Sequence, residues 1–465
     1  MFISCSSEGG SQSNNTSVDT PAVSYKVVYD SLLPKGRVVD SISCKSQPGN
    51  TYALYLPSYY STDKKFPCIF FFDAHARGAL PLRKYKDLVE KYGFVCIGSD
   101  VSKNGMQWQV TNDLINTMMG DVRTKININS KRIYAAGFSG GSRVAATLAI
   151  TNNDIAGVIG CAAGFSGENI QRKFDYFGMV GEYDFNLIEM KKLDQDLEAG
   201  HFTHQLLMFV GKHDWPSASD FESALLWMQL NAIKENLQSG NKTIVEAFKA
   251  DFSKRIEVAK KANDYCKAHV LLDGVIRAMS GIEDIAPYQK QLADISSGDK
   301  MRTAFALQDK IENTEINQQQ ELASQFTMHD EKWWSNKISE LNKNIHTAHT
   351  PQESNMYKRL VNYLGLVAYM NTNHALSAGD LPNALKYVTV FKMADPDNPD
   401  CYYLAAQYYM GKADQQQALL SLKRSADLGY SDISQITGEQ AFAALRNTDD
   451  FKNIVNKVIS NYSSK

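Results

Sequence analysis

Residues Arg132 to Gly141 read Arg-Ile-Tyr-Ala-Ala-Gly-Phe-Ser-Gly-Gly, and they are the most informative segment for the fold. Its first half is apolar, and a helical pattern of small and apolar residues follows over Ser142–Thr151. The sequence therefore places G-x-S-x-G, centred on Ser139, between a strand and a helix. In that context the motif forms a sharp turn that presents the serine as a nucleophile. A plain glycine-rich turn is the alternative.

The small residues around Ser139 fit such a turn. Side chains at Gly137 and Gly141 would collide across it, because the serine sits in a strained backbone conformation. The first N–H groups of the following helix would then face the site and favour developing negative charge. We therefore expect the Gly140 N–H to be one donor of an oxyanion hole.

Apolar runs and helical patterns alternate on both sides of the motif, which predicts a mostly parallel sheet covered on both faces. The expected strands are Ala53–Leu56, Cys68–Phe72, Phe94–Gly98, Ile133–Ala136, Ala156–Cys161, Tyr176–Val180 and Leu206–Val210. The expected helices are Leu80–Lys91, Thr111–Arg123, Ser142–Thr151, Leu187–Glu198 and Phe221–Glu235. Ligands of such sheets bind beyond the carboxyl ends of the strands.

That rule selects the base and the acid that a serine nucleophile needs. Among the histidines that follow Ser139 in this half, His213 comes directly after a predicted strand, whereas His201 and His204 precede that strand. A surface histidine in a turn is the alternative for His213. The acid is expected after the strand Tyr176–Val180, where Asp184 is favoured and Glu182 is the alternative.

The second oxyanion donor is expected in the loop after Phe72, as the backbone N–H of Ala74 or His75. The His75 side chain could instead contact the substrate or satisfy a local hydrogen bond. Phe138 and Trp215 are candidates to line the substrate site, although Trp215 could equally be part of the core.

With these residues in place, residues 30–235 resemble the α/β-hydrolase superfamily. The elbow Arg132–Gly141 and the loop Gly211–Pro216 are most similar to the polyhydroxybutyrate depolymerase and feruloyl or acetyl-xylan esterase group, whose catalytic histidine commonly precedes Trp-Pro. The resemblance implies an α/β-hydrolase fold, with Ser139 as nucleophile, Asp184 as acid and His213 as base. It covers under half of the chain, and it departs after Phe72, where the family usually shows His-Gly.

The rest of the chain reads as successive helices. We expect a tether at 1–25, an α/β-hydrolase domain at 26–240, a helical linker domain at 241–360 and helical repeats at 361–465. Ala384-Leu385 and Ala418-Leu419 lie 34 residues apart, a period that resembles tetratricopeptide repeats. Such a face could bind a protein or peptide; the alternative is a scaffold that shapes the substrate site without contributing catalytic groups.

At the N-terminus, Phe2-Ile3-Ser4-Cys5 resembles a bacterial lipobox, which predicts lipid attachment at Cys5 and a location in the cell envelope. A chance cysteine in a disordered tail is the alternative. The net charge is -2 and no basic block is present, so we expect no nucleic-acid partner. No run of 18 apolar residues occurs, so a membrane contact is expected only through the anchor.

Seven cysteines show no Cys-x-x-Cys spacing, which argues against a zinc cluster or a redox pair, and no metal or cofactor is expected. The sequence as a whole predicts a serine hydrolase that cleaves carboxylic esters through an acyl-enzyme, on carbohydrate- or polymer-linked acyl groups. Two alternatives stay open: a serine peptidase of the same fold, and an inactive hydrolase that serves with the repeats as a binding platform.

Overall fold

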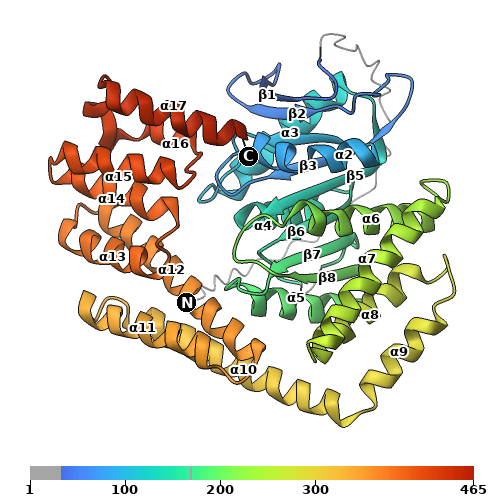
Figure 1. Cartoon of the computed structure of the whole chain (residues 1–465). Coiled ribbons are helices and arrows are strands. Elements are labelled where there is room, and N and C mark those ends of the chain that lie inside the picture. Colours follow the sequence, from blue (N-terminus) through green and yellow to red (C-terminus); the bar gives the residue numbers. More distant parts are fainter. Residues whose placement is uncertain (1–32, 168–169, 465) are drawn as a thin grey trace, which may run out of the picture.

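The computed structural model describes residues 33–167 and 170–464, which form an α/β unit and a helical unit (Figure 1). Cys5 and the predicted tether lie outside these residues, so lipid attachment stays a prediction. None of the helices within the described ranges combines the length and the apolar character that a transmembrane span requires.

The α/β unit is built on one eight-stranded sheet with the order β1-β2-β4-β3-β5-β6-β7-β8. Its strands are β1 (Val38–Ser43), β2 (Thr51–Tyr55), β3 (Phe66–Phe72), β4 (Val95–Ser99), β5 (Ile128–Phe138), β6 (Ile155–Cys161), β7 (Asp175–Gly181) and β8 (His204–Phe209). β2 pairs antiparallel with both β1 and β4, and all other neighbours are parallel. The seven expected strands are confirmed. β1, a half-exposed edge strand, was not expected.

Helices cover both faces of this sheet, because side chains of a strand point alternately to either face. In β3, Ile69 and Phe71 enter one core and Phe70 and Phe72 the other. The helices α1 (Ala79–Lys84), α2 (Lys86–Tyr92) and α6 (Ala218–Lys234) cover the first face; α3 (Trp108–Lys125), α4 (Gly140–Thr151) and α5 (Leu187–Ala199) cover the second. The α/β-hydrolase fold class, followed by a helical region, is thereby confirmed.

The hydrophobic cores divide the chain at places other than the expected boundaries. Phe248 of α7 (Lys242–Lys261) and Leu272 of α8 (Tyr265–Met279) are buried in the same core as Phe71, so the sheet's core extends past residue 240. A separate core runs from Ile311 to Val458. The expected boundary at residues 360 and 361 falls inside one continuous helix of that core, α12 (Pro351–Ser377).

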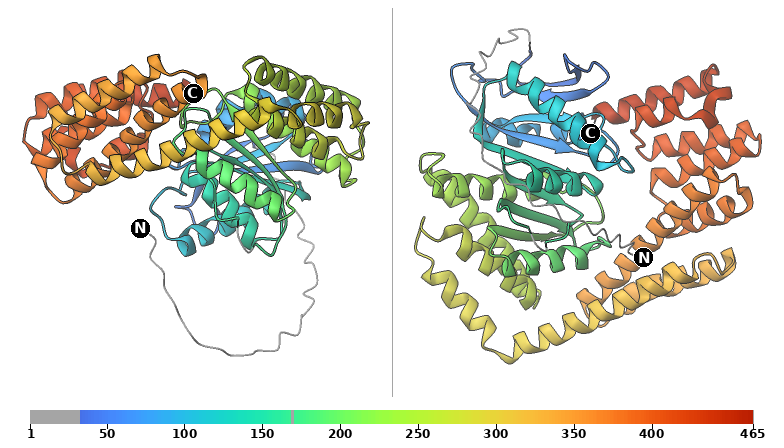
Figure 2. Two further views of the ribbon diagram at one scale, coloured as in Figure 1. Left: turned by 90° about the horizontal axis from the view of Figure 1, so that it is seen from below. Right: turned by 180° about the vertical axis from the view of Figure 1, so that it is seen from behind.

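The helical unit consists of α-helical hairpins beside the sheet (Figure 2). Besides α12 its helices are α10 (Asp299–Gln325), α11 (Glu331–Thr347), α13 (Leu381–Ala394), α14 (Pro399–Gly411), α15 (Gln415–Asp427), α16 (Ile433–Gly438), the 3-10 helix η1 (Gln440–Leu445) and α17 (Asp449–Ser464). The preceding helix α9 (Ala286–Ser296) packs Tyr288 and Leu292 against the sheet core instead. α12 packs on α13, and α14 packs on α15. Ala384 and Ala418 are both fully buried. The tetratricopeptide character of these hairpins stays a prediction.

The helical unit contacts the α/β unit at several places. From its middle, Asn362 of α12 donates a hydrogen bond of 2.7 Å to the carbonyl oxygen of Tyr183, just beyond β7. At its end, the Arg83 guanidinium lies 4.7 Å from the centre of the Tyr462 ring in α17. The chain's last helix therefore returns to the sheet, as Figure 1 shows.

Candidate active site

Ser139 occupies a strained turn between β5 and α4. Its backbone angles are φ 54° and ψ −121°, a positive φ that non-glycine residues rarely adopt. A β-carbon on Gly137 would lie 2.0 Å from the carbonyl oxygen of Gly141, and one on Gly141 would lie 2.0 Å from that of Phe72. Only glycine fits at either position. The motif thus forms the expected elbow, not a plain turn.

The structure brings Ser139, His213 and Asp184 together from three different strand ends. His213 Nε2 lies 2.9 Å from Ser139 Oγ, and His213 Nδ1 lies 3.0 Å from each oxygen of the Asp184 carboxylate. Asp184 is fully buried, whereas the His213 side chain is 20 % exposed. A proton can therefore pass between the serine and the imidazole at a point that substrate can reach.

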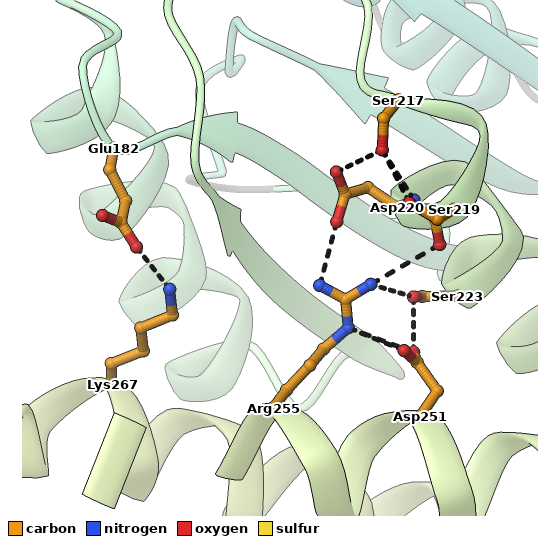
Figure 3. A network of polar contacts seen from close by, with 8 residues as sticks. All are labelled: Glu182, Ser217, Ser219, Asp220, Ser223, Asp251, Arg255 and Lys267. Carbon is orange, nitrogen blue, oxygen red and sulfur yellow. Dashed lines mark hydrogen bonds and ion pairs between the residues drawn. The ribbon is translucent and has the colours of Figure 1, made fainter. Parts of the chain in front are cut away.

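The two carboxylates of the loop after β7, Asp184 and Glu182, point in different directions. Asp184 Oδ1 also accepts the Asn186 N–H at 2.9 Å, which fixes the carboxylate toward His213. Glu182 instead points away from His213 and pairs with Lys267 of α8 (Figure 3). It also accepts a hydrogen bond of 3.1 Å from Asn355 of α12. Glu182 therefore cannot orient the imidazole, which removes the alternative acid.

A polar network fixes the chain directly after the His213 loop (Figure 3). Ser217 caps α6 by accepting the Asp220 N–H, and Arg255 of α7 donates to Asp220 at 2.9 Å and to Asp251 at 3.0 Å. Arg255 also donates to Ser223 at 3.1 Å. α7 thus anchors α6, and with it the C-terminal end of the loop that carries the histidine.

The hydrogen bonds that the backbone already makes show which of the expected N–H groups remain available as oxyanion donors. Gly140 begins α4 directly after the serine, and Ser139 makes no side-chain capping bond that would occupy the Gly140 N–H. The His75 N–H is already used, because it donates to Asp73 Oδ1 at 2.9 Å. Within residues 33–167 and 170–464, the Ala74 N–H donates to no other group. Of the expected donors, the N–H groups of Gly140 and Ala74 are therefore not engaged elsewhere in the described part of the chain, whereas that of His75 is.

Asp73 joins the oxyanion loop to the histidine loop. Its buried carboxylate accepts hydrogen bonds from Arg77 Nε at 2.7 Å, from Arg77 Nη2 at 3.0 Å and from Trp215 Nε1 at 2.9 Å. Burial alone would raise the pKa of Asp73, but the charge and hydrogen bonds of Arg77, with smaller effects of His75 and Trp215, lower it below the ordinary value. Asp73 is therefore a permanent anion at neutral pH.

Trp215 does not line the substrate site as expected. Only 3 % of it is exposed, and its ring packs against Phe71 and Tyr85. It is a core residue whose indole N–H supports Asp73. Phe138, also buried, packs on the His213 ring from one side at 4.9 Å between centroids. The side chain of His75 is 38 % exposed and stays a candidate substrate contact.

Two further residues, which the sequence pattern did not indicate, touch the site. Phe185 stacks on the His213 ring at 4.4 Å. The Asn104 side chain packs on Gly140, since a β-carbon on Gly140 would lie 1.7 Å from Asn104 Oδ1. The backbone N–H of Asn104 donates to the Ala74 carbonyl at 2.9 Å. Asn104 follows the carboxyl end of β4, so the strand-end rule could have found it.

Helical residues also reach this edge. Burial tends to lower the pKa of Arg77, but Asp73 and, more weakly, Asp400 and Asp432 hold it above its ordinary value. Asp400 belongs to α14 and Asp432 caps α16. The helical unit therefore contributes carboxylates whose negative charge acts on Arg77.

A cavity of about 560 Å³ lies away from the triad, and none of the three triad residues lines it. Glu182, Met208, Cys266, Ile311 and Arg359 are among its lining residues, so it lies between the sheet edge and α8, α10 and α12. No cluster of three or more potential metal ligands occurs in residues 33–167 and 170–464.

Comparison with known proteins gives structural likenesses only. No protein-family model and no curated protein sequence matches the chain. An S-formylglutathione hydrolase from Staphylococcus aureus is 15 % identical, with 42 % of this chain and 98 % of that chain covered and a TM-score of 0.35. An esterase from Pyrobaculum calidifontis is 13 % identical (44 % and 87 % covered, TM-score 0.35), and a ferulic acid esterase from Anaeromyces mucronatus is 15 % identical (38 % and 84 %, TM-score 0.31).

Proposed function

We propose that the protein is a serine hydrolase that cleaves carboxylic esters through an acyl-enzyme intermediate. The observation that carries the proposal is the hydrogen-bonded chain Ser139–His213–Asp184 at a positive-φ turn beside two N–H groups. Such a chain activates a serine hydroxyl, which is otherwise a weak nucleophile.

In the proposed reaction, Ser139 Oγ attacks the ester carbonyl while His213 Nε2 takes the hydroxyl proton. The Asp184 carboxylate accepts a hydrogen bond from His213 Nδ1–H and stabilises the imidazolium that forms. The N–H groups of Gly140 and Ala74 bind the oxyanion of the tetrahedral intermediate. His213 then protonates the departing alcohol. In the second half of the reaction His213 takes a proton from water, which attacks the acyl-enzyme, and then returns that proton to Ser139 Oγ as the carboxylic acid leaves. No cofactor takes part in this scheme.

We further propose that the helical unit is a wall of the substrate site. Only 13 residues, 162–174, join β6 to β7, which leaves no room for a lid insertion at that point. The carboxylates Asp400 and Asp432, which act on Arg77, come from the helical unit instead. This arrangement supports a bulky alcohol or acyl group, such as one linked to a carbohydrate or polymer, held between the oxyanion loop and α14–α16.

A fluorophosphonate probe followed by a substrate panel tests the proposal. The probe should label the wild-type protein at Ser139, and p-nitrophenyl acetate should be hydrolysed faster than aminoacyl amides. Ser142→Ala is a matched control that should retain labelling, because Ser142 lies one turn along α4 with its hydroxyl bonded to the Ala163 carbonyl at 2.6 Å. A faster amide reaction would favour a peptidase, and absence of labelling would favour an inactive binding platform.

A further inference from the structure

One face of α12 is occupied by the loop that carries the candidate acid. Asn355, Lys358, Arg359 and Asn362 lie at intervals of three and four residues, so they share that face. Asn362 Nδ2 donates to the Tyr183 carbonyl at 2.7 Å, and Arg359 Nη1 donates to the Glu182 carbonyl at 2.8 Å. Lys358 lies 4.2 Å from the centre of the Tyr183 ring.

The N–H groups of the same two residues are held by β8 and the loop that follows it. The Glu182 N–H donates to the Phe209 carbonyl at 2.8 Å, and the Tyr183 N–H donates to the Gly211 carbonyl at 2.9 Å. The two residues that precede Asp184 are therefore fixed by their N–H groups from the end of β8 and its loop, and by their carbonyl groups from α12. Without α12, those carbonyls keep no partner from the helical unit.

The donor from α12 is itself rigid. Arg359 is almost fully buried and makes a bidentate ion pair with Glu315 of α10, at 2.8 Å from Nε to Oε1 and 2.6 Å from Nη2 to Oε2. A planar guanidinium held in this way can aim its remaining N–H group at one fixed acceptor. The ion pair thus transmits the packing of α10 against α12 to the backbone of the acid loop.

We propose that α12 positions the triad, with Asn362 and Arg359 as positioning residues that hold Asp184 against His213. They touch neither the reacting serine nor the substrate site, and they act through the peptide groups before the acid. The inference rests on the proposed serine-hydrolase function. It makes the helical unit part of the catalytic apparatus and not only a wall for substrate.

The test is a double-mutant cycle between Asn362 and Asp184, measured with p-nitrophenyl acetate. Asn362→Ala removes the donor, and Asn362→Asp keeps the shape but cannot donate while ionised. Each should lower kcat roughly 10- to 100-fold with little change in KM, because small displacements of a catalytic group have effects of that size. In an Asp184→Asn background the same substitutions should change kcat less than about twofold, since the residue acts through Asp184.

Asn371→Ala is the matched control, because Asn371 lies on the same helix and its amide bonds only to the Val367 carbonyl within α12. It should leave kcat unchanged. Arg359→Lys should keep a charge against Glu315 and lower kcat as Asn362→Ala does; circular dichroism establishes that each variant is folded. Unchanged kcat in Asn362→Ala and Asn362→Asp, or equal fold-changes in both Asp184 backgrounds, would overturn the inference. A wild-type protein without turnover or probe labelling would instead refute the proposed function.

Discussion

Replacing Asp73 by asparagine should weaken the fold and the site together. The substitution keeps the shape of the side chain but removes its charge, which leaves Arg77 without its bidentate partner. It also weakens the acceptor for Trp215 Nε1, at 2.9 Å, and for the His75 N–H, at 2.9 Å. Four hydrogen bonds that meet at one fully buried carboxylate are therefore disturbed by one change.

The expected loss can be estimated from the burial of the two partners. Breaking a buried ion pair by removing one partner costs about 3–5 kcal/mol. Because the Arg77 side chain is 20 % exposed, water can partly solvate it, and we expect a loss near the lower limit of about 3 kcal/mol. The pKa of Asp73 is lowered by folding, so its stabilisation is present above the ordinary carboxyl pKa and is lost as the pH falls through the lowered value. The effect should be complete at neutral pH.

Urea unfolding at neutral pH, followed by tryptophan fluorescence, measures this loss, and p-nitrophenyl acetate turnover measures the effect on the site. Asp87→Asn is the matched control, since the Asp87 side chain is 99 % exposed and should change stability by less than about 0.5 kcal/mol. kcat of Asp73→Asn should also fall, because Ala74 and the His213 loop both adjoin Asp73. An unfolding free energy equal to that of wild type would show that the buried ion pair does not hold these loops.

Three further predictions concern the nucleophile, the acid and the pH dependence of stability. Ser139→Ala should abolish probe labelling and ester turnover with an unchanged circular dichroism spectrum, because only Oγ is removed; retained turnover would refute the assignment of the nucleophile. Asp184→Asn should lower kcat on the order of 10⁴-fold, whereas Glu182→Gln should have a much smaller effect on kcat, and the reverse order would mean that the acid is misassigned. Burial and, next, Glu235 raise the pKa of Asp175 to about 7, so this group's contribution to stability is full at acid pH and is lost as the pH rises through about 7; Asp175→Asn should therefore stabilise the protein in urea at about pH 8 more than at about pH 5, and an equal difference at both would contradict a raised pKa.

The triad could be predicted from the sequence because each member follows its strand directly. Ser139, Asp184 and His213 come from β5, β7 and β8, and the carboxyl ends of parallel strands meet at one edge of the sheet. The local pattern and one geometric rule were sufficient for these three residues. The choice between Ala74 and His75 could not be made from the sequence, because it depends on Asp73 accepting the His75 N–H.

The expected helix Leu80–Lys91 shows how a tertiary contact changes a local pattern. In the structure Tyr85 separates α1 from α2, with φ −109° and ψ 10°. The Tyr85 ring is fully buried and stacks on Phe221 of α6 at 3.9 Å between centroids. Helical spacing was present on both sides of Tyr85, but a contact 136 residues away in sequence is not encoded in that spacing.

Contacts of the helical unit were the part that sequence could not supply. Asn362 and Tyr183 are 179 residues apart, and neither stands out from its neighbours in type or pattern. The 34-residue spacing indicates that helices pack on one another, but it does not indicate which outer face meets the sheet. Which face meets the sheet depends on how the surfaces of the two folded units dock, and this involves side chains from both units.

The hydrophobic cores and the polar contacts divide this chain in different ways. Burial separates a sheet core that includes α7 and α8 from a helical core that runs from Ile311 to Val458. Polar contacts cross that division at the acid loop, where Arg359 and Asn362 bind the carbonyl groups before Asp184. They also cross it at Lys212, the residue before His213, whose Nζ donates to Asp395 Oδ1 at 3.2 Å. The fully buried residues of each core lie within one unit, whereas the backbone of the acid loop is bound from both units. The helical unit would then influence catalysis through the acid and histidine loops even for a substrate too small to touch its wall.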